Sequence, residues 1–218
     1  SDDQATWDLL AAGDTQGVFP FESTESMALL KEFKPDCFED LVLLLSVGRP
    51  GLIEILPDLV EAKQGKHSIS YPHPVLQNIL GSTYGFLVYQ EQVMDILAKI
   101  GGFSYDQANH YRKILGKRKQ SGIMEMRNMF TAGAASAGFS HEIVGDVLDR
   151  LEQDTAYTFN RAHAGAYALL GYRCAYLKAH YPDEFLSSSF YYLIPWALAT
   201  MKERRMAMGF KTWSGEQS

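Results

Sequence analysis

Glycine and proline residues interrupt this chain at short intervals, and the segments between them have the apolar spacing of amphipathic helices. In the segment 90–100, for example, apolar residues recur every three or four positions, and a Gly-Gly pair follows as a stop signal. We therefore predict an all-α fold, mainly helical, with at most a small β-hairpin. The predicted helices cover residues 4–12, 22–33, 36–47, 90–100, a segment that follows Ser104, and then 124–137, 141–153 and 165–179.

Two helix ends are predicted from single residues. Asp36 is a natural N-cap, and Glu39 stands three positions later as its capping-box partner. Gly116 is predicted at the C′ position of a helix, because glycine adopts the left-handed conformation that this position favours. The residues that follow, 117–119, would then form a flexible loop just beyond the helix end.

The bulk properties are those of an ordinary globular protein. The chain has 218 residues and 46% hydrophobic content, so it is long enough and apolar enough to bury a substantial core. Its formal net charge is −6. No apolar stretch approaches the roughly 20 residues that span a bilayer, and no signal peptide is predicted. Cys37 and Cys174 have no partner at metal-ligand spacing. They are predicted to be reduced and buried, which favours a cytoplasmic setting.

Five cationic side chains gather in eight positions of this acidic chain. No Asp or Glu occurs between Gln107 and Gly122, so the cluster has no carboxylate nearby in sequence. Uncompensated cations of this kind favour a polyanion such as nucleic-acid phosphate or a nucleotide triphosphate. The alternative is a solvated helix end whose cations complement the helix dipole. The cluster consists of Arg112, Lys113, Lys117, Arg118 and Lys119.

A second group of polar and aromatic residues precedes the helix predicted at 165–179. Asn160, Arg161 and His163 supply donors, and a helix N-terminus flanked by such residues suits an anion. Phe159 and Tyr167 are placed to stack on a base or ribose. Each of the rings at 163 and 167 also fits a role in the core.

No catalytic centre is visible. The chain has no Ser-His-Asp arrangement, no His and Cys cluster at zinc spacing and no convincing set of carboxylates for metal ions. The glycine-rich loop at 13–19 lacks the Lys-Ser or Lys-Thr pair of a phosphate-binding P-loop. We therefore predict neither catalytic nor metal-ligating residues within this chain.

Several short motifs resemble those of the bacterial C-family replicative DNA polymerases, the α subunit of DNA polymerase III. They occur in the family's order, which makes the resemblance far more specific than any single motif. The matching segments are GDTQGVF at 13–19, KPDCFEDL at 34–41, RPG at 49–51, YG at 84–85, VYQEQVM at 88–94, LGKRK at 115–119, FNRAH at 159–163, AYA at 166–168 and LKAHYP at 177–182.

The resemblance implies a fingers domain, the mainly helical module that closes on the incoming nucleotide. Residues 1–12 would end the connection from the palm, 13–193 would form the fingers, and 194–218 would be a C-terminal helical tail. The five cations of the cluster would face the triphosphate or nearby backbone phosphates. The nascent base pair would be lined by Arg49, Asn160, Arg161 and His163.

The resemblance also implies what this chain lacks. The catalytic aspartates of the family belong to the palm and hold two Mg²⁺ ions, so Mg²⁺ is expected for the full polymerase but not for this segment alone. The isolated segment is expected to be inactive in DNA synthesis. Its implied partners are primer-template DNA, dNTP, and the palm and other domains of the α subunit, without a membrane, at the replisome in the cytoplasm.

Two other functions stay open at this stage. The chain could be a stand-alone protein that reuses the fingers fold to bind DNA or a replisome protein without polymerase activity. It could also be a generic helical nucleic-acid binder, whose DNA affinity dNTP would not alter.

Overall fold

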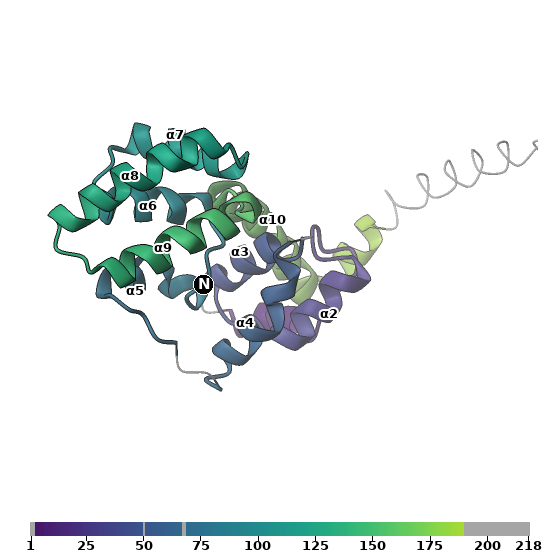
Figure 1. The fold of residues 1–218 in the computed structure, drawn as a ribbon. Helices are drawn as coiled ribbons and strands as arrows, with labels where there is room; N and C mark the ends of the chain where they lie inside the picture. Colours follow the sequence, from purple (N-terminus) through teal and green to yellow (C-terminus); the bar gives the residue numbers. More distant parts are fainter. Residues whose placement is uncertain (1–2, 50, 67–68, 190–218) are drawn as a thin grey trace, which may run out of the picture.

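Helices account for all the regular secondary structure of the described residues, which are 3–49, 51–66 and 69–189 of the computed structural model (Figure 1). This confirms the predicted all-α class. The helices are α1 (Gln4–Ala11), α2 (Thr24–Phe33), α3 (Phe38–Val47), α4 (Leu56–Lys63), α5 (Pro74–Leu80), α6 (Gln90–Lys99), α7 (Tyr105–Gly116), α8 (Gln120–Ser136), α9 (His141–Asp154) and α10 (Arg161–His180), with short 3-10 turns η1 (Ile53–Ile55), η2 (Gly81–Thr83) and η3 (Thr155–Tyr157).

The described residues contain no β-hairpin. Their one β-type contact is an isolated parallel bridge between Tyr89 and Phe159. Residues 182–189 are helical as well. The predicted domain limits at residues 12 and 193 stay predictions, and the predicted tail at 194–218 lies outside the described residues.

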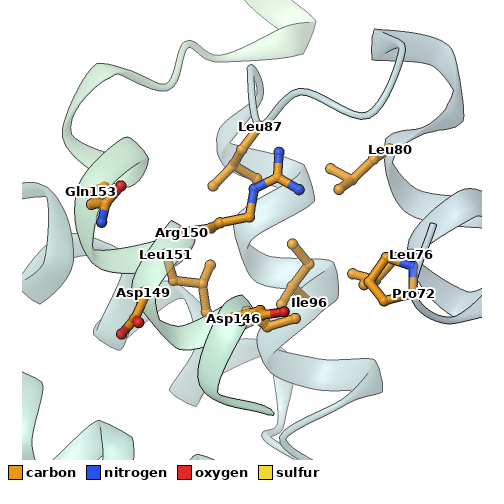
Figure 2. A pocket seen from close by; sticks show the side chains of 11 residues that line it. Pro72, Leu76, Leu80, Leu87, Ile96, Asp146, Asp149, Arg150, Leu151 and Gln153 are labelled. Carbon is orange, nitrogen blue, oxygen red and sulfur yellow. The ribbon is translucent and has the colours of Figure 1, made fainter. Parts of the chain in front are cut away.

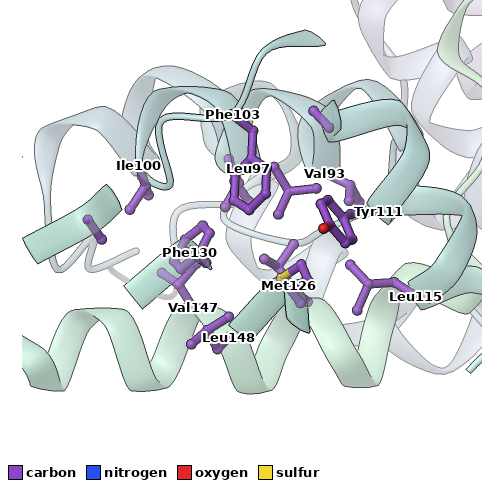
Figure 3. Close-up of a cluster of buried hydrophobic side chains, with 14 of the residues drawn as sticks. Val93, Leu97, Ile100, Phe103, Tyr111, Leu115, Met126, Phe130, Val147 and Leu148 are labelled. Atoms are coloured by element: carbon purple, nitrogen blue, oxygen red, sulfur yellow. The ribbon is translucent and has the colours of Figure 1, made fainter. Parts of the chain in front are cut away.

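Two hydrophobic cores divide the fold. One core lies among α5 to α9, on the side of the molecule that carries α7 and α8 in Figure 1. Figure 3 shows its centre, where Leu97, Phe130 and Leu115 are fully buried. Burying one such side chain contributes about 1.5–3 kcal/mol. The residues of this core recur at helical spacing in α6 to α9, which is why the sequence pattern predicts these four helices. No helix is predicted from the sequence at α4 or α5.

The second core is built around α3 and α10, which pack against each other. The run Leu41 to Leu44 on α3 is buried, as predicted for a central helix. The buried side of α10 consists of small residues, which let neighbouring segments approach this helix closely. These buried residues of α10 are Ala164, Ala168, Gly171 and Ala175.

The prediction that Asp36 caps α3 is wrong. The N-cap is Cys37, which makes no side-chain capping bond. Asp36 instead pairs with Lys63 of α4, whose Nζ also lies 2.6 Å from an Oδ atom of the buried Asp40. The hydrogen bond from Lys63 lowers the pKa of Asp36, against a smaller opposing effect of burial. A long-range ion pair has therefore replaced the local cap. Cys37 is exposed, so the prediction that it is buried is wrong.

Candidate functional site

The five predicted phosphate-binding cations lie where α7 ends and α8 begins. We call them the basic turn. Lys113, Lys117, Arg118 and Lys119 are exposed, and the half-buried Arg112 donates to Asn109 Oδ1 at 2.9 Å. Within the described part of the chain, no carboxylate forms an ion pair with any of them. The lack of local compensation expected from the sequence therefore extends to the neighbouring helices.

The prediction that Gly116 ends α7 in a left-handed conformation is wrong. The helix continues through Gly116, and the left-handed residue is Arg118, with φ of 51°. The Lys119 N–H donates to Ile114 O at 3.2 Å and the Arg118 N–H donates to Leu115 O at 2.9 Å. This bonding pattern is a Schellman motif, with Arg118 at the C′ position that glycine usually occupies.

The basic turn is therefore short and ordered rather than a flexible loop. Lys119 is already the N-cap of α8. A non-glycine residue in the left-handed region costs about 1 kcal/mol or more. Glycine at position 118 would remove this backbone strain, but arginine places a guanidinium at the tip of the turn.

The N-terminus of α10 is organised by carboxylates. Asn160 is its N-cap, and the Asn160 Oδ1 atom accepts from the His163 N–H at 2.7 Å. The Arg161 N–H donates to the Glu91 carboxylate at 3.0 Å, and the Arg161 guanidinium donates to Glu39 Oε2 at 2.6 Å. The first amide of the helix is thus not free, and an anion that binds here has to displace a carboxylate.

A row of aromatic rings runs from this end of α10. The Arg49 guanidinium lies 4.3 Å from the Phe159 ring centroid. The Phe159 and His163 rings are 5.5 Å apart, and His163 and Tyr167 are 4.7 Å apart. Phe19 extends the row, with its ring 5.5 Å from that of Tyr167. We call the four rings the ring row.

The ring row is a surface feature. Tyr167 and Phe19 are 39% and 44% exposed, and His163 is exposed. The alternative that His163 and Tyr167 are core residues therefore does not hold. Phe19 is not among the site residues predicted from the sequence, because its partner Tyr167 is distant in the chain.

Tyr157 connects the basic turn with the region of Arg49. The Arg118 guanidinium donates to the Tyr157 hydroxyl at 3.3 Å and lies 5.7 Å from the ring centroid. The Tyr157 ring is also packed so closely on Gly51 that a Cβ atom at position 51 would overlap it. Gly51 adopts φ of 95° and lies two residues after Arg49. Sequence reasoning missed Tyr157, since its partners are distant in the chain.

The Tyr89 ring contacts Arg161 at the N-terminal end of α10. It is almost completely buried, and burial raises the pKa of its hydroxyl far above the ordinary value. The Arg161 guanidinium lies 5.8 Å from its ring centroid. Arg161 is therefore held between the Glu39 carboxylate and an aromatic face.

One group of side chains in the described residues has the composition of a metal site, namely Asp36, Cys37 and Asp40. It does not fit Mg²⁺, because the Lys63 ammonium is bound to both carboxylates and a thiol is a poor ligand for a hard cation. The expectation that Mg²⁺ belongs to the full polymerase stays a prediction.

A hollow lies elsewhere in the described residues, between α5, α6 and α9. It has a volume of about 340 Å³. Figure 2 shows Arg150 extending between Leu87 and Leu80 over an apolar floor that includes Ile96. None of the predicted site residues lines it. Separately, no helix among the described residues is long and apolar enough to cross a membrane.

Comparison with known proteins gives the family. Residues 1–138 match the model of the bacterial DNA polymerase III alpha subunit finger domain. The chain is 42% identical over 187 residues to the DNA polymerase III subunit alpha of Borreliella burgdorferi, which covers 86% of the chain and 16% of that protein. The corresponding proteins of Halalkalibacterium halodurans and Xylella fastidiosa are 41% identical over 186 and 189 residues, with 85% and 86% of the chain covered.

The chain spans 16% to 17% of the length of these relatives. The match covers more than half of the chain and agrees with the helical fold and with the ordered motifs. The resemblance found in the sequence is thereby confirmed, and the chain belongs to the finger-domain family of the bacterial DNA polymerase III α subunit.

Proposed function

We propose that this chain is the part of a replicative DNA polymerase that binds the incoming dNTP and primer-template DNA. The observation that supports this most strongly is the basic turn, whose exposed cations have no carboxylate partner among the described residues. Tyr157 contacts both Arg118 of this turn and Gly51, which lies two residues after Arg49. Phosphate binding would relieve the mutual repulsion of these cations. The catalytic aspartates and the Mg²⁺ ions that they hold would belong to another part of the polymerase.

The proposed roles follow the two parts of the site. Phe159 and Tyr167 offer rings to a base or ribose, since stacking contributes about 1–3 kcal/mol per base. Arg161 reaches a phosphate only by exchanging Glu39 for it, whereas the basic turn needs no such exchange. The residues proposed to contact phosphate or the nascent base pair are Arg49, Arg112, Lys113, Lys117, Arg118, Lys119, Asn160, Arg161 and His163.

Fluorescence anisotropy of a labelled primer-template tests the proposal. We expect salt-sensitive binding that becomes tighter when the templated dNTP is added, and no tightening with a non-templated dNTP. With Mg²⁺ and all dNTPs, the isolated chain should not extend the primer. Extension by a repurified sample would show that catalytic carboxylates lie within this chain.

A different outcome would favour the stand-alone alternative, a DNA- or replisome-binding protein without polymerase activity. That protein would bind DNA with the same affinity whether or not dNTP is present. An open reading frame that continues upstream into a palm would argue against this alternative.

The outer face of α10 supports a further part of the proposal, namely contact with other domains of the polymerase. The buried side of α10 is a narrow stripe of small residues, so most of the surface of this helix is not covered by the described residues. Large apolar side chains are exposed from Tyr167 to Leu186. We infer that another domain of the same longer polymerase, such as the palm, packs on this face. A replisome location in the cytoplasm follows from the same proposal. The residues that we place under the other domain are Leu169, Leu170, Tyr176, Leu177, Tyr181 and Leu186.

Hydroxyl-radical footprinting checks the covered face. Tyr176 and Tyr181 are 39% and 51% exposed in this chain, so both should be labelled in the isolated segment. In a polypeptide that also carries the palm, we expect both to be protected. Tyr105 on α7 is 57% exposed and serves as the control that stays labelled. Equal labelling of Tyr176 and Tyr181 in both samples would refute the inferred contact.

A further inference from the structure

The segment 89–92, with the sequence YQEQ, does more than begin α6. Two of its residues, Gln90 and Glu91, hold the chain at 158–161, which carries Phe159 and the cap of α10. The Gln90 N–H donates to Phe159 O at 2.9 Å, and the Gln90 side chain reaches Thr158 O at 3.5 Å. Glu91 accepts from the Arg161 N–H at 3.0 Å. The segments lie about 70 positions apart in sequence.

Gln92 is the buried member of the segment, with 5% of its surface exposed. Its Oε1 atom accepts from the N–H groups of Val88 and Tyr89, both at 2.9 Å. Its Nε2 atom donates to Thr83 Oγ1 at 2.7 Å and to Ile79 O at 3.2 Å. All four hydrogen-bonding positions of the amide are therefore used.

The backbone at Val88 and Tyr89, which is bonded to Gln92, is also bonded to Phe159. On its other side, Val88 O accepts from the Phe159 N–H at 2.8 Å, which forms half of the parallel bridge. Val88 and Tyr89 are 0% and 2% exposed, so water does not replace a lost bond there. A shift of this backbone is transmitted to the Phe159 ring and to Arg49, which lies on that ring.

We propose that Gln92, assisted by Glu91, is a positioning residue for base recognition, which fixes the Phe159 ring and the start of α10 in the geometry that a base requires. The proposal rests on the proposed function for its consequence in DNA binding. Its structural part, the placement of Phe159 against His163, holds independently of any ligand.

Gln92→Met and Gln92→Glu separate positioning from stability. Methionine has a similar length but accepts no strong hydrogen bond, so it should release the Val88 and Tyr89 N–H groups. Glutamate still offers an oxygen that accepts from the Val88 and Tyr89 N–H groups. Its second oxygen replaces the amide donor and lies opposite Ile79 O, where it is repelled. Both variants should be less stable, yet only Gln92→Met should move Phe159.

The ring-current shift of the His163 Cε1 proton in NMR spectra reports that movement, because the Phe159 ring lies 5.5 Å away. We expect this shift to change in Gln92→Met and to be retained in Gln92→Glu. The His180 ring, 4.4 Å from Tyr176 at the other end of α10, is the internal control whose shift should not change. If Gln92→Met does not fold, Glu91→Ala replaces it as the test, because Glu91 is less buried. This variant should also move the His163 signal.

DNA affinity gives the second readout. Loss of one base stack should weaken primer-template binding by Gln92→Met about 5- to 100-fold. Val147→Ala is the control for stability, since Val147 is 4% exposed on α9 and belongs to the core shown in Figure 3, which contains none of the four rings of the ring row. It should lower stability without changing the His163 signal or the DNA affinity.

The outcomes distinguish the two proposals. An unchanged His163 signal in Gln92→Met and Glu91→Ala overturns the positioning role. A moved signal with unchanged DNA affinity also overturns it, because Phe159 would then not act in base recognition. If the unmodified chain does not bind DNA, the proposed function fails, while the NMR comparison still decides whether Gln92 places Phe159.

Discussion

Replacing Lys117, Arg118 and Lys119 together with alanine is expected to reduce the salt dependence of DNA binding more than any other change of three charges. Each phosphate contact contributes about 0.9 to the slope of log K against log salt on duplex DNA and about 0.7 on single strands. Loss of three contacts should therefore lower the slope by about 2 to 2.7. All three side chains are exposed and without a carboxylate partner in the described structure, so little intramolecular bonding is lost.

A matched triple variant controls for net charge. Lys31, Lys66 and Lys99 are also exposed, on α2, after α4 and on α6. Their replacement with alanine changes the net charge equally but should leave the slope nearly unchanged. Equal effects of the two triple variants would mean that DNA responds to the overall charge of the chain and not to the basic turn.

Arg118→Gly tests the turn from the side of stability. Glycine occupies the left-handed region without the penalty that arginine has at φ of 51°. The free energy of unfolding, measured by denaturant titration, should therefore rise by about 1 kcal/mol. The salt slope should fall by about 0.9 on duplex DNA in the same variant. A gain in stability together with weaker DNA binding would indicate that Arg118 lowers the stability of the chain but contributes a phosphate contact through its guanidinium.

The parts of the fold that could be predicted from sequence depend on local interactions. Ser23 and Ser104 cap α2 and α7 through bonds to the backbone three residues later. Asp36 has the same local preference but pairs with Lys63, 27 positions away. Gly116 fits a helix end, yet the Schellman bonds close two residues later at Arg118. Both errors arise where a contact or a backbone geometry outweighed the preference of a single residue.

The candidate site divides in the same way. The basic turn was predictable because the absence of acidic residues around it is visible in the sequence. The contact of Arg118 with Tyr157 joins residues 39 positions apart, and the pair of Arg161 with Glu39 joins residues 122 positions apart. No local pattern encodes such pairs, so the ion pair between Arg161 and Glu39 could not be predicted from the residues around either one.

Gly133→Ala is expected to cause a large loss of stability, because α8 crosses the end of α6 at this glycine. A Cβ atom at position 133 would overlap the carbonyl oxygen of Gly101 and lie 2.8 Å from its carbonyl carbon. Both atoms belong to the backbone, so no side-chain rotation relieves the overlap. Gly101 itself is enclosed by Phe130, which is fully buried in the core shown in Figure 3. The helix and the turn must therefore move apart.

Overpacking of this kind costs about 1–3 kcal/mol or more, while alanine in a helix regains about 1 kcal/mol relative to glycine. Since the clash is with backbone, we expect the free energy of unfolding of Gly133→Ala to fall by about 2 kcal/mol in denaturant titrations. Gly145 in α9 is the matched control, because no described atom lies within 4 Å of a Cβ built there. Gly145→Ala should raise the stability by about 0.5–1 kcal/mol. The opposite signs expected for one substitution in two helices follow from the neighbours of each glycine, and a stabilised Gly133→Ala would show that α8 and the α6 terminus are not in contact.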